Sequence, residues 1–247
     1  MQTGLRRLIG QVAFLGFALG IVILSGSTAS ALPKLDDYVM SPSIKKLVAT
    51  GRTVAANQAE LSKLGSDFGN AYRLKEGNYT FIAPDYLEYS TQVGPTKVSL
   101  ITTNEYKLVK VRAGIVRKDV KDDISDDTTK RQTLFSLGLL PENFVETVLS
   151  NYVGRETVQG IDCVVFDLRY KKEGPDVKRH FLIWVDPVKK YVVQKKVWDL
   201  NGRTRETIVY SRPVDVDGRV WVPGRAEAFN QESKLGGVVE YSSISTQ

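Results

Sequence analysis

The spacing of apolar residues separates the chain into stretches of different secondary structure. In residues 43–64 apolar side chains recur at steps of three and four, from Ile44 and Leu47 to Leu61 and Leu64. This period is typical of an amphipathic helix with one buried face. We therefore predict an N-terminal helix over these residues.

From residue 71 the period changes to two, and glycine, proline and asparagine interrupt the pattern at short intervals. Alternation of apolar and polar residues between turns is typical of antiparallel strands with one buried face. A polar, acidic stretch at 119–129 then predicts a loop. The strands predicted before this loop comprise residues 79–82, 86–92, 97–102 and 105–111.

Apolar residues are dense again in residues 134–149, where Pro141 separates two short predicted helices. Residues 152–245 then return to period two. A long sheet with one apolar face must bury that face against another layer. The sequence predicts a mainly β fold with a helical lid. In it, a curved antiparallel sheet forms an unclosed barrel covered by the N-terminal helix and a central helical pair.

Helices that do not fill the hollow of such a sheet leave an apolar cavity for hydrocarbon ligands. Which face of each strand points inward is open, because a slip of one residue reverses the assignment. Ordinary core packing is the alternative role for each candidate. We expect a lipid-binding cavity lined by Phe81, Leu87, Tyr89, Leu100, Leu108, Phe166, Trp184, Val193 and Trp198 from the strands and by Phe135, Leu139, Phe144 and Val148 from the helical pair.

The first 31 residues have the pattern of a secretory signal peptide. Arg6 and Arg7 precede an apolar run at 12–24, and Ala29-Ser30-Ala31 supplies small residues for cleavage. The run is shorter than the ~20 residues that span a bilayer, which argues against an uncleaved anchor. We predict a Sec-type signal peptide at 1–31 and a single exported domain at 32–247.

Charge and cysteine content narrow the classes of function. The net charge of +6 falls to +4 after cleavage, because residues 1–31 contain two arginines and no other charged side chain. Lysines and arginines alternate with acids along the predicted strands, so we expect no nucleic-acid binding but allow peripheral membrane contact. Cys163, the single cysteine, leaves no partner for a disulfide within the chain, and its apolar surroundings predict a small buried side chain.

Motifs for catalysis are missing from the sequence. It has no serine-nucleophile elbow, no phosphate-binding glycine loop, no zinc-protease helix and no cysteine pair. His180 is the single histidine and alternates with apolar residues. The acids between Asp119 and Asp127 could bind calcium, but their spacing is not that of an EF-hand, and a solvated loop is the simpler interpretation. We expect no enzyme, no cofactor and no metal site.

Several strand-and-turn motifs follow one another along the mature chain. They include Tyr79-Thr80-Phe81-Ile82-Ala83-Pro84-Asp85-Tyr86, Gly154-Arg155-Glu156-Thr157-Val158-Gln159-Gly160, Leu182-Ile183-Trp184-Val185-Asp186-Pro187, Asp199-Leu200-Asn201-Gly202-Arg203 and Asp217-Gly218-Arg219-Val220-Trp221. In this order they resemble the outer-membrane lipoprotein-sorting family, the LolA- and LolB-like proteins. The resemblance implies a half-open β-barrel in the periplasm, with helices as a lid over a lipid or a lipoprotein acyl chain.

These observations favour a monomeric extracytoplasmic carrier or chaperone, non-enzymatic, that binds a lipid or the acyl chain of a lipoprotein for sorting or transport. The alternative is a regulatory module of the cell envelope that uses the same fold to bind a protein partner. An enzyme is the third possibility, and any histidine-based mechanism would then depend on His180.

Overall fold

The computed structural model describes residues 31–65, 68–69, 72–126, 133–172, 180–198 and 202–247. The chain divides into two compact units, Met1–Ala31 and Leu32–Gln247. All elements named below belong to the second unit. Residues 1–30, which carry the predicted signal peptide, lie outside the described residues, so this peptide and its cleavage stay predictions. In the described ranges no helix is both long and apolar enough to span a membrane.

Thirteen strands and four short helical segments make up the described part of this unit. The first half contains η1 (Leu35–Tyr38), β1 (Lys46–Ala56), α1 (Gln58–Leu64), β2 (Glu76–Ile82), β3 (Tyr86–Val93), β4 (Thr96–Thr102), β5 (Tyr106–Ala113) and β6 (Val116–Asp123). The second half contains η3 (Leu134–Leu137), α3 (Glu142–Val145), β7 (Val148–Val158), β8 (Ile161–Tyr170), β9 (His180–Val185), β10 (Val192–Trp198), β11 (Thr204–Val216), β12 (Val220–Asn230) and β13 (Leu235–Thr246).

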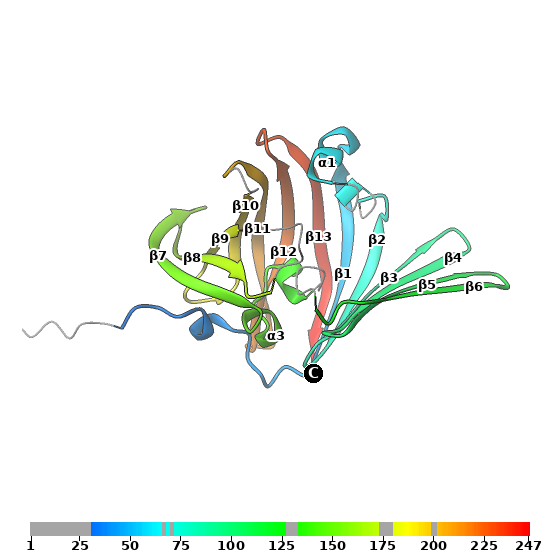
Figure 1. Ribbon diagram of the computed structural model, residues 1–247, viewed down its shortest axis with the longest axis horizontal. Helices are drawn as coiled ribbons and strands as arrows, with labels where there is room; N and C mark the ends of the chain where they lie inside the picture. Colours follow the sequence, from blue (N-terminus) through cyan, green and yellow to red (C-terminus); the bar gives the residue numbers. More distant parts are fainter. Residues whose placement is uncertain (1–30, 66–67, 70–71, 127–132, 173–179, 199–201) are drawn as a thin grey trace, which may run out of the picture. The chain divides into compact units, whose positions relative to one another are not determined.

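The strands form one antiparallel sheet in the order β6-β5-β4-β3-β2-β1-β13-β12-β11-β10-β9-β8-β7 (Figure 1). All neighbours except β1 and β13 are also consecutive in the chain. The first and last strands pair at the centre, so the sheet consists of two meanders that share one face. Strands β6 and β7 are the two edges, which confirms the prediction of a sheet that does not close.

The helix predicted over residues 43–64 is wrong for most of its length. Residues 46–56 form strand β1, which pairs with β2 on one side and β13 on the other. Along its first half burial alternates, with Leu47, Ala49 and Gly51 buried between half-buried neighbours. Of the positions that fit a period of 3.6, Leu47 and Gly51 also fit the buried face of this strand, whereas Val54 and Ala55 are exposed.

Local preference and pairing both favour the strand. The segment is rich in β-branched side chains, such as Val48, Thr50 and Thr53, which lose side-chain freedom in a helix and pack well on a pleated sheet. The strand also satisfies its backbone groups against two neighbours. Tertiary pairing thus overrides the helical period.

The end of the predicted helix is helical. The Asn57 side chain accepts hydrogen bonds from the backbone N–H groups of Ala59 and Glu60, at 3.2 and 3.3 Å, and so begins α1. Leu61 and Leu64 then pack on Ala228 of β12. The short helix therefore covers one part of β12 and β13 instead of the whole sheet.

The acidic stretch predicted as a loop begins as a strand. Asp119, Asp122 and Asp123 belong to β6, where Asp119 forms an ion pair with Arg112 of β5. Charged residues flank Val116 and Val120 along this edge strand, and such charges hinder pairing with another chain. Every residue of β6 is exposed and charges stand on both of its faces, so the pattern analysis found no alternation that would have indicated a strand.

The predicted central helical pair is present in shortened form, as η3 and α3. The Thr133 hydroxyl accepts a hydrogen bond from the Phe135 N–H and begins η3, and Gly138 ends it in the left-handed region. Pro141 directly precedes α3, as predicted. The apolar residues that follow α3 belong to the start of β7 instead of a longer helix.

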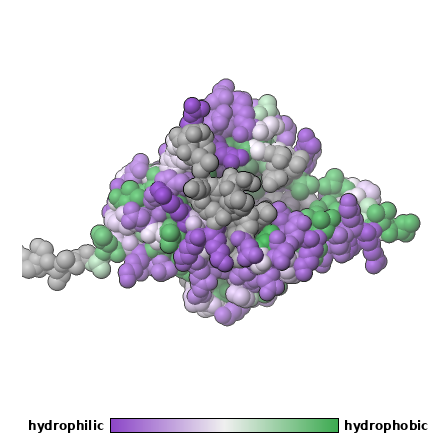
Figure 2. Space-filling model, in the orientation of Figure 1, coloured by the Kyte–Doolittle hydropathy of each residue, from purple (hydrophilic) through white to green (hydrophobic). Residues whose placement is uncertain are grey.

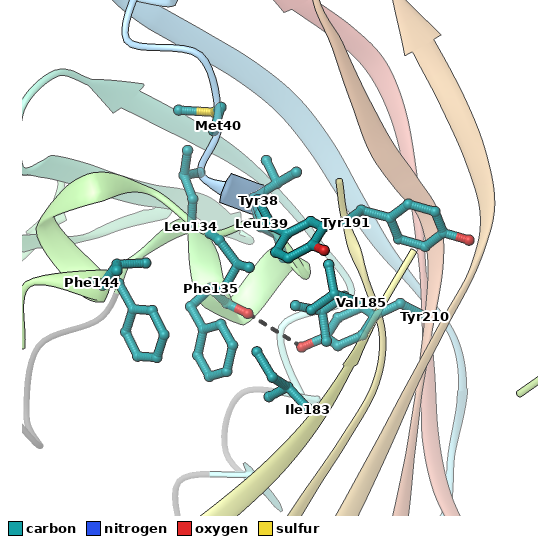
Figure 3. Close-up of a cluster of buried hydrophobic side chains, with 14 of the residues drawn as sticks. Tyr38, Met40, Leu134, Phe135, Leu139, Phe144, Ile183, Val185, Tyr191 and Tyr210 are labelled. Atoms are coloured by element: carbon teal, nitrogen blue, oxygen red, sulfur yellow. Dashed lines mark hydrogen bonds between the residues drawn. The ribbon is translucent and has the colours of Figure 1, made fainter. Parts of the chain in front are cut away.

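These two segments are packed into the main core, as Figure 3 shows. The rings of Phe135 and Phe144 stack with centroids 4.0 Å apart. The Tyr210 hydroxyl of β11 donates to the carbonyl oxygens of Phe135 and Ser136 at 3.4 and 3.3 Å. Leu134, a neighbour of this contact, is fully buried. Over this half of the sheet the helical segments are part of the solid core.

We expect Gly138→Ala to destabilise the fold more than Gly160→Ala. Both glycines have positive φ, +81° and +77°, which costs another residue about 1–2 kcal/mol. A Cβ at Gly138 would also lie 2.9 Å from the Tyr210 ring, whereas nothing lies within 4 Å at Gly160. Overpacking should add about 1–3 kcal/mol at Gly138 alone. Equal losses in urea unfolding would contradict this account of the core.

Candidate functional site

The pairing of the strands shows which side chains share a face. Residues directly opposite each other in an antiparallel pair point to the same side of the sheet. Leu47, Phe81 and Leu87 are opposite one another across β1, β2 and β3, and all three are buried in the main cluster. We call the side of the sheet that carries them the core face.

The structure brings most of the predicted wall residues together. Nine of them lie in one buried cluster, so their immediate neighbours are protein side chains. Tyr89 and Leu100 lie on the core face but are only half-buried, farther toward the β6 edge. The nine residues are Phe81, Leu87, Phe135, Leu139, Phe144, Val148, Phe166, Trp184 and Val193.

Three predicted wall residues lie on the opposite face of the sheet: Leu108, Trp198 and also Trp184, which is buried in the main cluster from that side. Leu108 is opposite Ile101, whereas core-face Leu100 is opposite Val109. Trp184 donates its indole N–H to Glu156 at 2.8 Å, and Trp198 packs beside His180. Each of these three residues is the chain neighbour of an apolar residue that lies on the core face. Both faces of these strands carry large apolar residues, so the sequence does not show which face points inward.

The core face continues beyond the helical segments onto β3–β6. One row of opposing residues runs outward from Tyr79 through Tyr89, Leu100 and Val109 to Val120. Among the described residues, the helices pack mainly against β7, β12 and β13, while Leu87 at the start of β3 still belongs to the main core. The apolar row is therefore partly open to solvent.

Exposure increases toward the ends of these strands. Val120, Val93 and Val116 are 44%, 52% and 59% exposed, and Ile115 in the β5–β6 turn is fully exposed. Figure 2 shows apolar side chains gathered at this end of β3–β6. A sheet face of this kind can bind an apolar partner by burial alone.

A group of tyrosines lies where the covered and the open parts of the core face meet. We call Tyr72, Tyr79, Tyr89 and Tyr241 the tyrosine cluster. The Tyr79 ring centroid lies 4.8 Å from that of Tyr89 and 5.9 Å from that of Tyr241. All four residues are half-buried. The cluster joins the main core to the smaller core under α1, where Tyr72 packs.

Glycines in the strands make room for these rings. A Cβ at Gly77 would lie 2.4 Å from the Tyr89 ring, and one at Gly237 would lie 2.2 Å from the Tyr72 ring. Gly51 is similarly close to Tyr79, at 2.8 Å. Any other residue at these positions would push the rings off the sheet. The backbone is thus shaped to hold the tyrosine cluster against the core face.

Burial keeps these phenols neutral. It raises the pKa of Tyr79 and Tyr241 well above the ordinary value, and it raises that of Tyr72 to about 12 with a smaller contribution from Glu206. Within the described ranges the hydroxyls of Tyr72, Tyr79 and Tyr241 form no hydrogen bond. They can therefore both donate to and accept from another molecule.

One ion pair lies beside the tyrosine cluster. Lys195 of β10 and Glu206 of β11 are 2.9 Å apart, with side chains only 14% and 11% exposed. The carboxylate raises the pKa of both Tyr72 and Tyr210, which places it next to these rings. Because each charge compensates the other, the surroundings carry no net charge.

Other candidates for chemistry lie elsewhere. His180 forms a side-chain hydrogen bond with Asp167, on the face opposite the core. Cys163 is fully buried, as predicted, and burial raises the pKa of its thiol to about 11. In the described part of the chain, no three His, Cys, Asp or Glu side chains come together as a metal site. Asp127 of the possible calcium loop lies outside the described residues.

Pattern analysis missed most of the tyrosine cluster. Tyr72 precedes β2, and Tyr241 follows a valine pair in β13, so neither stands out by period. The signal lies instead in the glycines, since a glycine inside a strand often marks the close approach of another group. Gly51 lies in the segment that was predicted as a helix, so it could not be recognised as a glycine inside a strand.

Alkaline pH should destabilise the fold through Tyr72. Its pKa is about 12 in the folded state, whereas tyrosines of an unfolded chain titrate at about 10. Between these values the folded chain holds a proton that the unfolded chain has released, so the free energy of unfolding falls as pH rises. Denaturant unfolding should show a smaller decline above about pH 10 for Tyr72→Phe. An unchanged decline in this variant would contradict the assignment.

No family model matches the chain, and no curated protein matches it. Solved structures with a similar fold do exist. A DUF1329 family protein from Desulfovibrio piger has 15% identity and a TM-score of 0.48, over 86% of this chain and 89% of that chain. A LolA superfamily protein from Nitrosomonas europaea has 15% identity and a TM-score of 0.46, over 85% and 89%. A domain from Vibrio parahaemolyticus, named for outer membrane lipoprotein sorting, has 11% identity and a TM-score of 0.46, over 82% and 85%. The second and the third of these structures carry names of the family that the sequence motifs resemble.

Proposed function

We propose that this protein is a non-enzymatic, extracytoplasmic carrier that shields the acyl chain of a lipid or a lipoprotein. One observation supports the proposal most strongly. The apolar core face continues past the helical segments onto β3–β6, where Leu100 and Val109 are only half-buried and Val120 is exposed. The predicted signal peptide is consistent with work outside the cytoplasm.

The size of this surface suits a hydrocarbon chain. Neighbouring strands lie about 4.8 Å apart, so the four strands β3–β6 present a surface roughly 14 Å wide. Full burial of a valine or leucine side chain contributes about 1.5–3 kcal/mol. Several such side chains covered by one flexible chain would hold it without any polar contact. The binding region therefore lies on β3–β6 and not beneath η3 and α3, where the core is solid.

A protein partner is the alternative occupant. Such a partner often adds a strand to an exposed sheet edge. Edge strand β6 carries charges on both sides of Val120, Lys118 and Asp119 before it and Lys121 and Asp122 after it, and this pattern disfavours strand addition. The acyl chain is thus the occupant that best fits the uncovered face.

The substitutions Val120→Glu and Ile82→Glu test this assignment as a matched pair. Both side chains are 44% exposed, but Val120 lies on the core face and Ile82 on the opposite face. A carboxylate at position 120 would have to leave water when an acyl chain covers it. We expect Val120→Glu to weaken binding of a fluorescent fatty-acyl probe about tenfold, or about 1.4 kcal/mol.

Ile82→Glu should leave the affinity for the probe within about twofold of the wild-type value. Circular dichroism would confirm that both variants fold. If the two substitutions had the same effect on affinity, the acyl chain would not lie on the core face of β3–β6. Binding of a stoichiometric envelope protein, with no affinity for acyl probes, would favour the regulatory module instead.

A further inference from the structure

Three hydroxyl groups of the tyrosine cluster, those of Tyr72, Tyr79 and Tyr241, form no hydrogen bond within the described part of the fold. The rings of Tyr79 and Tyr241 fill the space above Gly51, and phenylalanine rings would fill it equally well. Among the described residues, the buried side-chain oxygens without a partner belong to Thr102 and Asn143 and not to these tyrosines. The tyrosine hydroxyls therefore reach space that another molecule can enter. Three unpaired hydroxyls on one patch call for a ligand with oxygen atoms.

The surroundings of the tyrosine cluster select against a charged ligand group. The nearby cation, Lys195, is already paired with Glu206 at 2.9 Å. An anionic head would have to compete with that carboxylate, and a cationic head with that ammonium group. The phenols of Tyr79 and Tyr241 are uncharged at physiological pH, as a phenol with its ordinary pKa of about 10 is, and burial raises their pKa further. The tyrosine cluster therefore offers uncharged hydrogen-bond donors and acceptors to a ligand.

The position of the tyrosine cluster also fixes which end of a ligand it meets. Tyr79 and Tyr89 are the first members of the row that continues through Leu100 and Val109 to Val120. A chain lying along this row has its outer end at the β6 edge and its inner end at the tyrosines. An amphiphile would thus place its tail on the valines and leucine and its polar end against the hydroxyls.

We propose that the tyrosine cluster binds the uncharged, oxygen-bearing head of an amphiphile, with the glycerol and ester groups of an acylglycerol as the model chemistry. The inference rests on the proposed carrier function and adds the polarity of the ligand head. Phenolic hydroxyls of Tyr72, Tyr79 and Tyr241 donate to ester carbonyls and accept from glycerol hydroxyls. A free fatty acid has the same tail but a carboxylate, and the core-face lysines without a described ion pair, Lys107 and Lys118, lie on β5 and β6 and not among the tyrosines.

Isothermal titration calorimetry of the full chain with two probes tests this proposal. Monooleoylglycerol and oleate share one acyl chain and differ in the charge of the head. The double variant Tyr79→Phe/Tyr241→Phe keeps both rings and removes two hydroxyls. Tyr106→Phe is the matched control, because Tyr106 lies on the opposite face and packs with Lys121.

We expect the wild-type chain to prefer monooleoylglycerol, and the double variant to lose about tenfold in affinity for it. Affinity for oleate should stay within about twofold in the same variant, and Tyr106→Phe should change neither value. Because the hydroxyls bind nothing within the fold, the midpoint of urea unfolding should not decrease.

The two levels of the proposal fail in different ways. If both probes bind but the double variant keeps the wild-type preference between them, the tyrosine cluster does not bind the ligand head. This result would leave the proposed carrier function unaffected. A wild-type chain that prefers oleate would also overturn the inference alone. If neither probe binds to the wild-type chain, the carrier function and this inference are both wrong.

Discussion

Burial of the apolar core face is the constraint on which the rest of the structure depends. An open antiparallel sheet has no second sheet to pack against, so other elements must cover its dry face. Here η3, α3 and the residues around Tyr38 cover the β7–β12 side, where Phe135 and Phe144 are buried and their rings stack 4.0 Å apart. Little chain remains for β3–β6 among the described residues. The apolar core face is larger than the area that the helical segments cover, and the uncovered part on β3–β6 can therefore bind an apolar ligand.

The pairing of β1 with β13 makes the two halves one surface. Without it, β2–β6 would be a separate meander with no core of its own. Through it, the core face runs without a break from the packed helical segments to the open valines, and the tyrosine cluster stands at the transition. The glycines beneath the rings of Tyr79 and Tyr89 show that the strands themselves are adapted to this cluster. The core face is thus covered by the helical segments at one end, carries the tyrosine cluster in the middle, and is open over the apolar row of β3–β6.

The sequence predicted the period-two strands well, because turn residues separate them and one face is dry. The segment from Leu47 to Ala55 misled the analysis, since its apolar spacing fits a helical period and in part also a period of two, and only pairing with two neighbours decides between them. Trp184 and Trp198 lie on the face opposite most of the expected wall, and pattern alone could not show this, because apolar residues occupy both faces of these strands. The tyrosine cluster could not be predicted, since it unites residues of β2, β3, β13 and the segment before β2. Its formation depends on contacts between strands that lie far apart in the chain.

Paramagnetic relaxation by a spin-labelled fatty acid measures most directly whether an acyl chain occupies the open face. Methyl resonances of Leu100, Val109 and Val120 report on the core face of β4–β6, and those of Leu108 and Ile82 report on the opposite face. The account predicts saturable broadening that is clearly stronger for the first group than for the second, because broadening falls steeply with distance from the label. Equal broadening of both groups, or broadening confined to the opposite face, would contradict it.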